Sequence, residues 1–309
     1  MIRLALRVRR SVAELVLAEM LELAPSGVEE IEIPHRDGTE GIVEYAVYGA
    51  AGELPELPDL HAAAGGALVE ISTTEIPDDW SERWKQFHRP VLIEPPALGG
   101  VEDSVPTLHV RPPWEAPSDR AGVREIVIDP AQAFGTGAHA TTHLCLSLLL
   151  ELALTERTRG PVLDVGAGSG VLAIAAAKLG YSPIVALDND QESVHATVAN
   201  ATVNEVEVQA RRFDLRREAL PEIGGAPAPV MLANLLKPLL HDLAAAIVSP
   251  PRQVIASGLL RAEADGVVSA FRARHGMREH RRVERGEWAA IWLSGDRQNP
   301  RSPRGRPRV

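Results

Sequence analysis

The stretch PVLDVGAGSGVLAIAAAKLG, residues 161–180, decides how this chain folds. Its first residues, ending with Asp164 and a valine, predict a short buried strand, and VLAIAAAKLG predicts a helix that ends in glycine. Between them, Gly166, Gly168 and Gly170 permit a tight turn and let a ligand approach the backbone closely. A strand, a glycine-rich turn and a helix in this order indicate a doubly wound α/β sheet with a ligand at the carboxyl end of the strand.

The region from about Arg124 to Gly295 continues the same alternation of strands and helices. The expected strands are residues 124–130, 161–165, 183–188, 207–214, 229–236, 252–260, 278–285 and 286–295. The expected helices are residues 141–154, 171–180, 190–205, 237–248 and 262–276. This rhythm predicts a doubly wound, mostly parallel sheet with helices on both faces.

The first 75 residues have a different pattern, with the order strand, helix, strand, strand, helix, strand. The expected strands are residues 2–8, 27–34, 41–49 and 67–76, and the expected helices are residues 11–24 and 57–65. That order is typical of a small ferredoxin-like α+β domain. In the first helix, Val12, Leu15, Val16 and Met20 have the spacing of one helical face.

Residues 76–123 are interpreted as a linker between the domain at 1–75 and a second domain at 124–295. Trp80, Trp84 and Phe87 have the spacing of one helical face. They either pack between the two domains or contact a substrate. Two proline-rich segments follow them.

Residues 296–309 hold five arginines and one acid, with several prolines. This composition predicts a disordered basic tail. The tail is either a solvated appendage or the site of a weak contact with RNA.

The bulk composition is that of an ordinary globular protein. The chain has 309 residues, 45% hydrophobic and 24% charged, with a formal charge of −10. The acidic balance argues against non-specific attraction to nucleic acid. The single cysteine, Cys145, excludes an internal disulfide and fits a reducing compartment. Neither a signal-peptide core nor a membrane span is evident, so a cytoplasmic protein without membrane contact is expected.

The glycine-rich turn limits the choice of ligand. Its third glycine comes one residue too early for the dinucleotide fingerprint, and the lysine of a phosphate-binding loop is missing. An acid before such a turn suits a nucleoside without pyrophosphate, and S-adenosylmethionine is the commonest ligand of that kind. Asp188 ends the next strand at about the 20-residue spacing from which an acid accepts ribose hydroxyls. The alternative role for Asp188 is a helix cap, for which Asp190 is better placed.

Two further strands end in polar residues. The strand expected at residues 229–236 ends in ANLLKP, with Asn234 at its carboxyl tip, and the carbonyl of Asn234 can accept a hydrogen bond from an amine. Leu235 and Leu236 stand where many amino-group methyltransferases have two prolines, so Asn234 suits a nitrogen acceptor other than a nucleobase or glutamine. Asp214 either approaches an adenine amino group or is a surface turn acid.

The stretch AQAFGTGAHATT, residues 131–142, precedes an apolar helix. Thr141 or Thr142 can cap that helix, or the glycines can let the loop approach a ligand. The residues themselves leave both readings open.

Taken together, FGTGAHATT, LDVGAGSGVLAIAAAKLG, ALDND, ANLL and GEW resemble the PrmA family in order and spacing, over nearly the whole chain up to Gly295. That family methylates large-subunit ribosomal protein eleven. The resemblance implies the seven-stranded sheet of class I methyltransferases and an S-adenosylmethionine cofactor. The family's loop usually reads FGTGTHPTT, so Ala138 and Ala140 are departures that remove no side-chain ligand.

The resemblance also implies roles for individual residues. Thr142, Gly166, Gly168, Asp188 and Asn234 match positions that bind the cofactor. The residues that match the methyl-transfer pocket, besides Asn234, are Phe134, His139 and Trp288.

The function so implied is that of a monomeric protein-lysine N-methyltransferase that also accepts N-terminal amines. No metal site is expected, and no general base is evident, since His139 either takes a proton or structures its loop. The alternatives are a methyltransferase of the same build that acts on another protein or a small amine, an RNA methyltransferase, and a non-catalytic cofactor-binding module.

Overall fold

The computed structural model describes residues 2–24, 28–33, 41–49, 54–55, 57–75, 88–95, 106–130, 139–155, 159–225 and 229–295. These residues form two compact units. The first contains the described residues up to Arg89 together with Pro130, and the second contains the other described residues from Pro90 onward. The aromatic positions expected to form a linker helix, and the basic tail, lie outside the described ranges. Their roles, and the proposed domain bounds, stay predictions.

The described residues of the first unit form an antiparallel sheet with two helices. Its elements are β1 (Ile2–Arg9), α1 (Ala13–Leu23), β2 (Glu29–Ile33), β3 (Ile42–Gly49), α2 (Leu57–Ala64) and β4 (Leu68–Glu75). The strands lie in the order β2-β3-β1-β4. Since successive strand side chains point to opposite faces, one face of the sheet carries the apolar residues that form the core. The core residues include Leu4, Leu6, Val8, Met20, Val43, Tyr45, Val47 and Leu60.

Helix α1 buries a different stripe from the one expected. Val16 and Met20 are buried as expected, but Leu15 is 67% exposed and Val12 is 36% exposed. Leu17 is buried in place of Leu15. Both possible faces of the helix contain Val16 and Met20. The face that packs against the sheet therefore depends on the flanking residues, and in the structure it includes Leu17 and not Leu15.

The other face of this sheet carries a ladder of charges. Arg3 donates to Glu44 at 2.5 Å and to the hydroxyl of Tyr48 at 3.0 Å, while Arg7 contacts Glu44 at 2.7 Å and Glu70 at 2.6 Å. Burial alone would raise the pKa of Glu44, but the hydrogen bonds from Arg3 and Arg7 outweigh it and hold that pKa below its ordinary value. This face is therefore polar and ordered.

In the second unit, the described residues form a seven-stranded sheet, a three-stranded sheet and five α-helices. Its elements are β5 (Val91–Ile93), β6 (Thr107–Arg111), β7 (Val123–Val127), α4 (Ala140–Thr155), β8 (Val162–Val165), α5 (Val171–Lys178), β9 (Ile184–Asp188), α6 (Gln191–Val203), β10 (Gln209–Arg212), β11 (Val230–Asn234), α7 (Lys237–Ala246), β12 (Gln253–Leu260), α8 (Ala264–His275), β13 (Arg278–Arg285) and β14 (Trp288–Ser294).

The large sheet has the order β10-β9-β8-β11-β12-β14-β13. Its first five strands are parallel, and β14 and β13 close it as antiparallel neighbours. This confirms the predicted doubly wound, mostly parallel seven-stranded sheet. The chain moves outward from β8 to β10 and then returns to β11 on the other side of β8. Ligands of such sheets bind at this reversal, outside the carboxyl ends of the strands.

Strand β7 was expected in the large sheet, and this was wrong. It pairs parallel with β6, and β6 pairs antiparallel with β5, in the separate three-stranded sheet. The reason is packing, because Ile126 of β7 joins the same core as α4 and α5. The small sheet thus covers the outer side of the helix layer.

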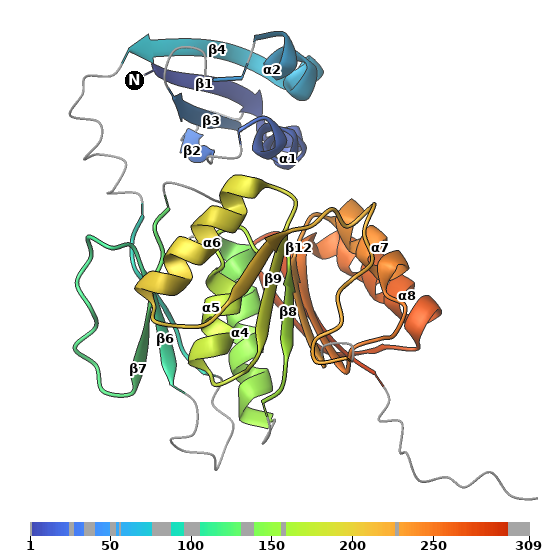
Figure 1. Cartoon of the computed structure of the whole chain (residues 1–309). Helices are drawn as coiled ribbons and strands as arrows, with labels where there is room; N and C mark the ends of the chain where they lie inside the picture. Colours follow the sequence, from blue (N-terminus) through green and yellow to red (C-terminus); the bar gives the residue numbers. More distant parts are fainter. Residues whose placement is uncertain are drawn as a thin grey trace, which may run out of the picture. The chain divides into compact units, whose positions relative to one another are not determined.

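Helices cover both faces of the large sheet (Figure 1). Helices α4, α5 and α6 lie on one face, and α7 and α8 lie on the other. Successive strand residues therefore pack on opposite faces of the sheet. Ile184 and Ala186 of β9 belong to the core beneath α4, α5 and α6, whereas Val185 and Leu187 belong to the core beneath α7 and α8.

Helix α4 lies between the large sheet and the small sheet and is mostly apolar, apart from a half-buried polar stripe of His143, Ser147 and Glu151. Ten of its sixteen residues are buried, including Cys145, which is fully inaccessible. Burial raises the pKa of the Cys145 thiol well above its ordinary range. The helix therefore gives its first turn a rigid base, and that turn carries Thr142.

Candidate functional site

The glycine-rich turn between β8 and α5 has the conformation that glycine permits. Gly166, Gly168 and Gly170 have φ angles of +76°, +53° and +80°, a region that strains other residues. A Cβ atom on Gly166 would lie 2.3 Å from Cδ2 of Leu235, and one on Gly170 would lie 2.9 Å from Cγ2 of Thr197. The turn is thus closely packed from β11 on one side and from α6 on the other.

Asp188 ends β9 directly beside this turn. Its carboxylate accepts hydrogen bonds from the amide of Gly168 at 2.8 Å and from the amide of Asp190 at 3.0 Å. Burial raises the pKa of Asp188, although these amides favour its charged form. A carboxylate has about four acceptor positions, so Asp188 retains capacity for a ligand's hydroxyl groups.

Helix α6 takes its cap from Asp190. The Asp190 side chain accepts from the amides of Glu192 at 3.3 Å and Ser193 at 3.1 Å. The capping role considered for Asp188 therefore falls to Asp190, and the carboxylate of Asp188 faces the glycine-rich turn.

Asp164 lies beneath the glycine-rich turn. From the sequence, it was recognised only as an acid near the end of a strand. It is fully buried, and its Oδ2 accepts from the amide of Ala173 at 3.0 Å. Its Oδ1 has no hydrogen-bond partner among the residues described. Burial raises the pKa of Asp164 to about 7, and the nearby charge of Asp188 adds to the shift. Asp164 thus changes charge near neutral pH.

Thr142 of α4 and Asn234 of β11 contact each other. Asn234 is the last residue of β11, and its Nδ2 donates to Oγ1 of the fully buried Thr142 at 3.3 Å. Helix α4 begins at Ala140, so Thr142 lies inside the first turn and not at the cap. Leu235, the residue after Asn234, is the one that lies against Gly166. The two groups of residues are therefore contiguous at the carboxyl ends of β8, β9 and β11.

His139 and Trp288 form an edge-to-face pair beside Thr142. Their ring centroids are 5.0 Å apart with an interplanar angle of 69°. The Nδ1 atom of His139 lies 2.8 Å from Oγ1 of Thr141 and accepts from the Thr141 amide at 3.4 Å. Burial lowers the pKa of His139 to about 4, so the ring is neutral at pH 7.

Two other positions were considered from the sequence. Phe134 lies outside the described residues. Asp214 accepts from the amide of Arg216 at 2.9 Å and contacts Arg217 at 3.3 Å, so it acts as a turn acid.

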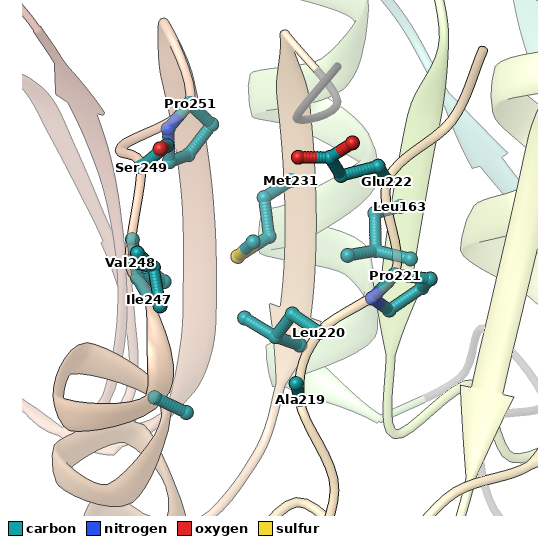
Figure 2. A pocket seen from close by; sticks show the side chains of 11 residues that line it. Leu163, Ala219, Leu220, Pro221, Glu222, Met231, Ile247, Val248, Ser249 and Pro251 are labelled. Carbon is teal, nitrogen blue, oxygen red and sulfur yellow. The ribbon is translucent and has the colours of Figure 1, made fainter. Parts of the chain in front are cut away.

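A pocket of about 100 Å³, open to solvent, lies at the other end of the sheet (Figure 2). Leu163 and Met231, near the beginnings of β8 and β11, form part of its wall, beside the loop that carries Leu220 and Pro221. It contains none of the predicted site residues. Within the described ranges there is no cluster of His, Cys, Asp and Glu able to hold a metal ion. Nor does any helix described here combine the length and apolarity required to cross a bilayer.

Comparison with known proteins gives consistent matches. The family described as "Ribosomal protein L11 methyltransferase (PrmA)" matches residues 59–295. Proteins named ribosomal protein L11 methyltransferase are similar to this chain. The one from Heliobacterium modesticaldum is 36% identical over 219 residues, and the match covers 69% of this chain and 63% of that protein. The one from Desulforapulum autotrophicum is 31% identical over 297 residues, covering 90% and 92%.

The match to another relative, from Symbiobacterium thermophilum, is 36% identical and spans 63% of this chain and 59% of that protein. Among solved structures, the ribosomal protein L11 methylase of Lactobacillus delbrueckii subsp. bulgaricus superposes with a TM-score of 0.54 at 29% identity. That match covers 61% of this chain and 94% of that one.

Proposed function

Because the chain belongs to the ribosomal protein L11 methyltransferase (PrmA) family, we propose that it transfers a methyl group from S-adenosylmethionine to amino groups of ribosomal protein L11. The acceptors are lysine side chains and the N-terminal amine. The observation that carries the proposal is the meeting of Asp188, Gly166 and the Asn234–Thr142 pair at the carboxyl ends of neighbouring parallel strands.

The residues present fit this cofactor. The left-handed glycines let a nucleoside approach the backbone closely, and the remaining acceptor positions of Asp188 suit the two hydroxyls of a ribose. The turn has no lysine for phosphate, which favours a ligand without pyrophosphate. When bound, S-adenosylmethionine supplies a methyl group on a positively charged sulfur. Thr142, Gly166, Gly168, Asp188 and Asn234 are the residues we assign to holding it.

Asn234 is assigned a second task, which is to orient the acceptor amine. Its Nδ2 is directed to Thr142, so its carbonyl oxygen Oδ1 is the atom that can accept from an incoming N–H group. A hydrogen bond to Oδ1 would direct the nitrogen lone pair away from Asn234. Alignment of this kind is the main contribution that a protein makes to a displacement reaction.

The acceptor lysine must arrive without its proton, since its ordinary pKa is about 10.4. His139 is a poor base for this step, because its pKa is about 4 and its Nδ1 already accepts from Thr141. We assign His139 to holding Trp288 and, with Phe134, to forming an apolar wall. Such a wall lowers the pKa of a bound lysine, so that its proton leaves to water.

The test is to incubate the protein with S-adenosylmethionine bearing a labelled methyl group and, separately, with purified ribosomal protein L11, other ribosomal proteins, small amines and RNA. Transfer to lysines of L11, located by mass spectrometry, is the expected result. Transfer only to another protein, a small amine or RNA would replace the proposed substrate. Cofactor binding without transfer to any of them would identify a non-catalytic binding module.

A further inference from the structure

Helix α6 contacts the glycine-rich turn with polar side chains. The hydroxyl of Thr197 donates to the carbonyl of Gly168 at 2.9 Å, and Nδ2 of Asn200 donates to the carbonyl of Ser169 at 2.9 Å. Thr197 and Asn200 are buried. A Cβ atom on Gly170 would also meet Thr197, so the helix lies directly on the turn.

The same helix contacts the end of β7. Oδ1 of Asn200 accepts from the amide of Asp129 at 3.1 Å. The amide side chain of Asn204, just past the helix, accepts from the Val127 amide at 2.9 Å and donates to the Val127 carbonyl at 2.7 Å. It also donates to the carbonyl of Asn200 at 2.8 Å. The sequence continues from Asp129 into FGTGAHATT, whose last threonine is Thr142.

Asn200 is the residue that contacts both sides. Its donor end binds the turn that follows β8, and its acceptor end binds the chain that leaves β7. Thr197, Asn200 and Asn204 have the spacing of one helical face, so a single rigid helix aligns all of these bonds.

We propose that Asn200 is a positioning residue for cofactor binding, which fixes the glycine-rich turn relative to the exit of β7, with Thr197 and Asn204 supporting it on either side. This inference rests on the proposed function. Asn200 touches no reacting atom, and it acts through the backbone of Ser169 and Asp129.

A purely structural role is the competing explanation, because buried backbone groups need partners in any fold. The two explanations differ in what a substitution changes. A structural role predicts lower thermal stability with unchanged affinity in the folded protein. A positioning role predicts lower affinity than in a variant of equal stability that leaves these bonds intact.

The first measurement is calorimetric titration of the full chain with S-adenosylhomocysteine. Asn200→Asp keeps the acceptor for the Asp129 amide but places an oxygen against the carbonyl of Ser169. We expect Kd to rise about tenfold, the scale of losing one buried hydrogen bond and leaving a group unsatisfied. Val194→Ala is the matched control, since Val194 is a buried residue of the same helix without any side-chain hydrogen bond, and it should lower stability with little change in Kd.

Thr197→Val provides a second variant in case Asn200→Asp does not fold. It keeps the side-chain shape and removes the bond to Gly168 alone, so Kd should rise about threefold. Equal Kd values for Thr197→Val, the folded Asn200→Asp protein and Val194→Ala would overturn the inference.

The second measurement is a double-substitution cycle with Asn204→Ser, which acts on the β7 side. If the effect of Asn204 on the turn passes through Asn200, Asn204→Ser should raise Kd in the original chain and change it little in the Asn200→Asp background. Additive effects would contradict the coupling. Failure of the original chain to bind S-adenosylhomocysteine would instead overturn the proposed function, and this inference with it.

Discussion

The two halves of the site are held in place in different ways. On the cofactor half, the side chains of Asp188, Thr197 and Asn200 bond directly to the backbone of the glycine-rich turn. On the acceptor half, Asn234, which we assign to both the cofactor and the amine, donates to Thr142 through one hydrogen bond of 3.3 Å, and the ring centroids of His139 and Trp288 are 5.0 Å apart. The first half is thus preorganised by several bonds to main chain, whereas the second depends on single contacts between side chains. Substitutions in the first half should mainly weaken cofactor binding, and substitutions in the second half should mainly slow methyl transfer.

The strongest test of this difference is Asn234→Ala. Loss of the oxygen that orients the amine should lower the rate of methyl transfer at saturating substrates about a hundredfold, the scale of misplacing a reacting group. The Kd of S-adenosylhomocysteine should change by a much smaller factor. Single-turnover kinetics and calorimetry measure the two quantities. Asn234→Asp is the matched control, because it keeps Oδ1 and should retain more activity. A hundredfold loss of affinity with normal turnover would reverse the assignment of the halves.

Asp188→Ala should have the opposite signature. Losing hydrogen bonds to a charged group costs about 2 kcal/mol, so Kd should rise roughly thirtyfold. The fold should persist, since Asp188 lies at a strand tip. Asp190→Ala serves as the control, because it removes the cap of α6 and should cost about 1 kcal/mol of stability without a comparable loss of affinity. Unchanged affinity in folded Asp188→Ala, measured by calorimetry, would exclude Asp188 from the site.

The titration of Asp164, which lies beneath the glycine-rich turn, allows the stability of the cofactor half to be measured without a ligand. Its pKa is about 7 in the folded protein and near 3.9 in an unfolded chain, so between these values the folded state holds a proton that the unfolded state releases. Its contribution to the free energy of unfolding therefore falls as pH rises from about 4 to about 7, by up to about 1.4 kcal/mol per pH unit.

The measurement is urea unfolding of the original chain and of Asp164→Asn at several pH values. Since asparagine does not titrate, the variant should gain stability relative to the original chain as pH rises through this window. A constant difference from pH 5 to pH 8 would show that Asp164 is already ionised at pH 5 in the folded protein, and that its pKa is not raised as far as this.

Removing residues 296–309 should have the smallest effect. The last strand, β14, ends at Ser294, and Trp288 is retained, so cofactor affinity and transfer to isolated L11 should stay nearly unchanged. If the five arginines contact RNA, binding of the full chain to ribosomal particles should weaken steeply with salt, and deletion should reduce that slope. Lost activity on the isolated protein would place the tail in the catalytic region.

The fold and the residues at the strand ends could be predicted for one reason. When strands alternate with helices along the chain, the strands are parallel and their carboxyl ends lie at one edge of the sheet. Gly166, Asp188 and Asn234 could be assigned from that rule alone. Thr142, His139 and Trp288 could not, because they come from other parts of the chain, and only the resemblance to a family indicated them. Asn200 was not recognised at all, since an asparagine on a helix looks like a surface residue until its partners are known.

The errors in the fold also have physical causes. The strand at β7 follows the same alternation of strands and helices as the strands of the large sheet, and its pairing with β6 and packing in the core of α4 and α5 assign it elsewhere. The face of α1 was misread because Leu15 and Leu17 are equally apolar, and local pattern does not distinguish them.

The burial of Cys145 has a practical consequence. It is the sole thiol of the chain and is fully inaccessible inside α4, so maleimide reagents should leave the native protein unmodified. A single cysteine introduced at an exposed position, such as Thr202→Cys on α6, would then carry a fluorescent dye at one known place. The chain can thus be labelled for single-molecule spectroscopy without first removing a native cysteine.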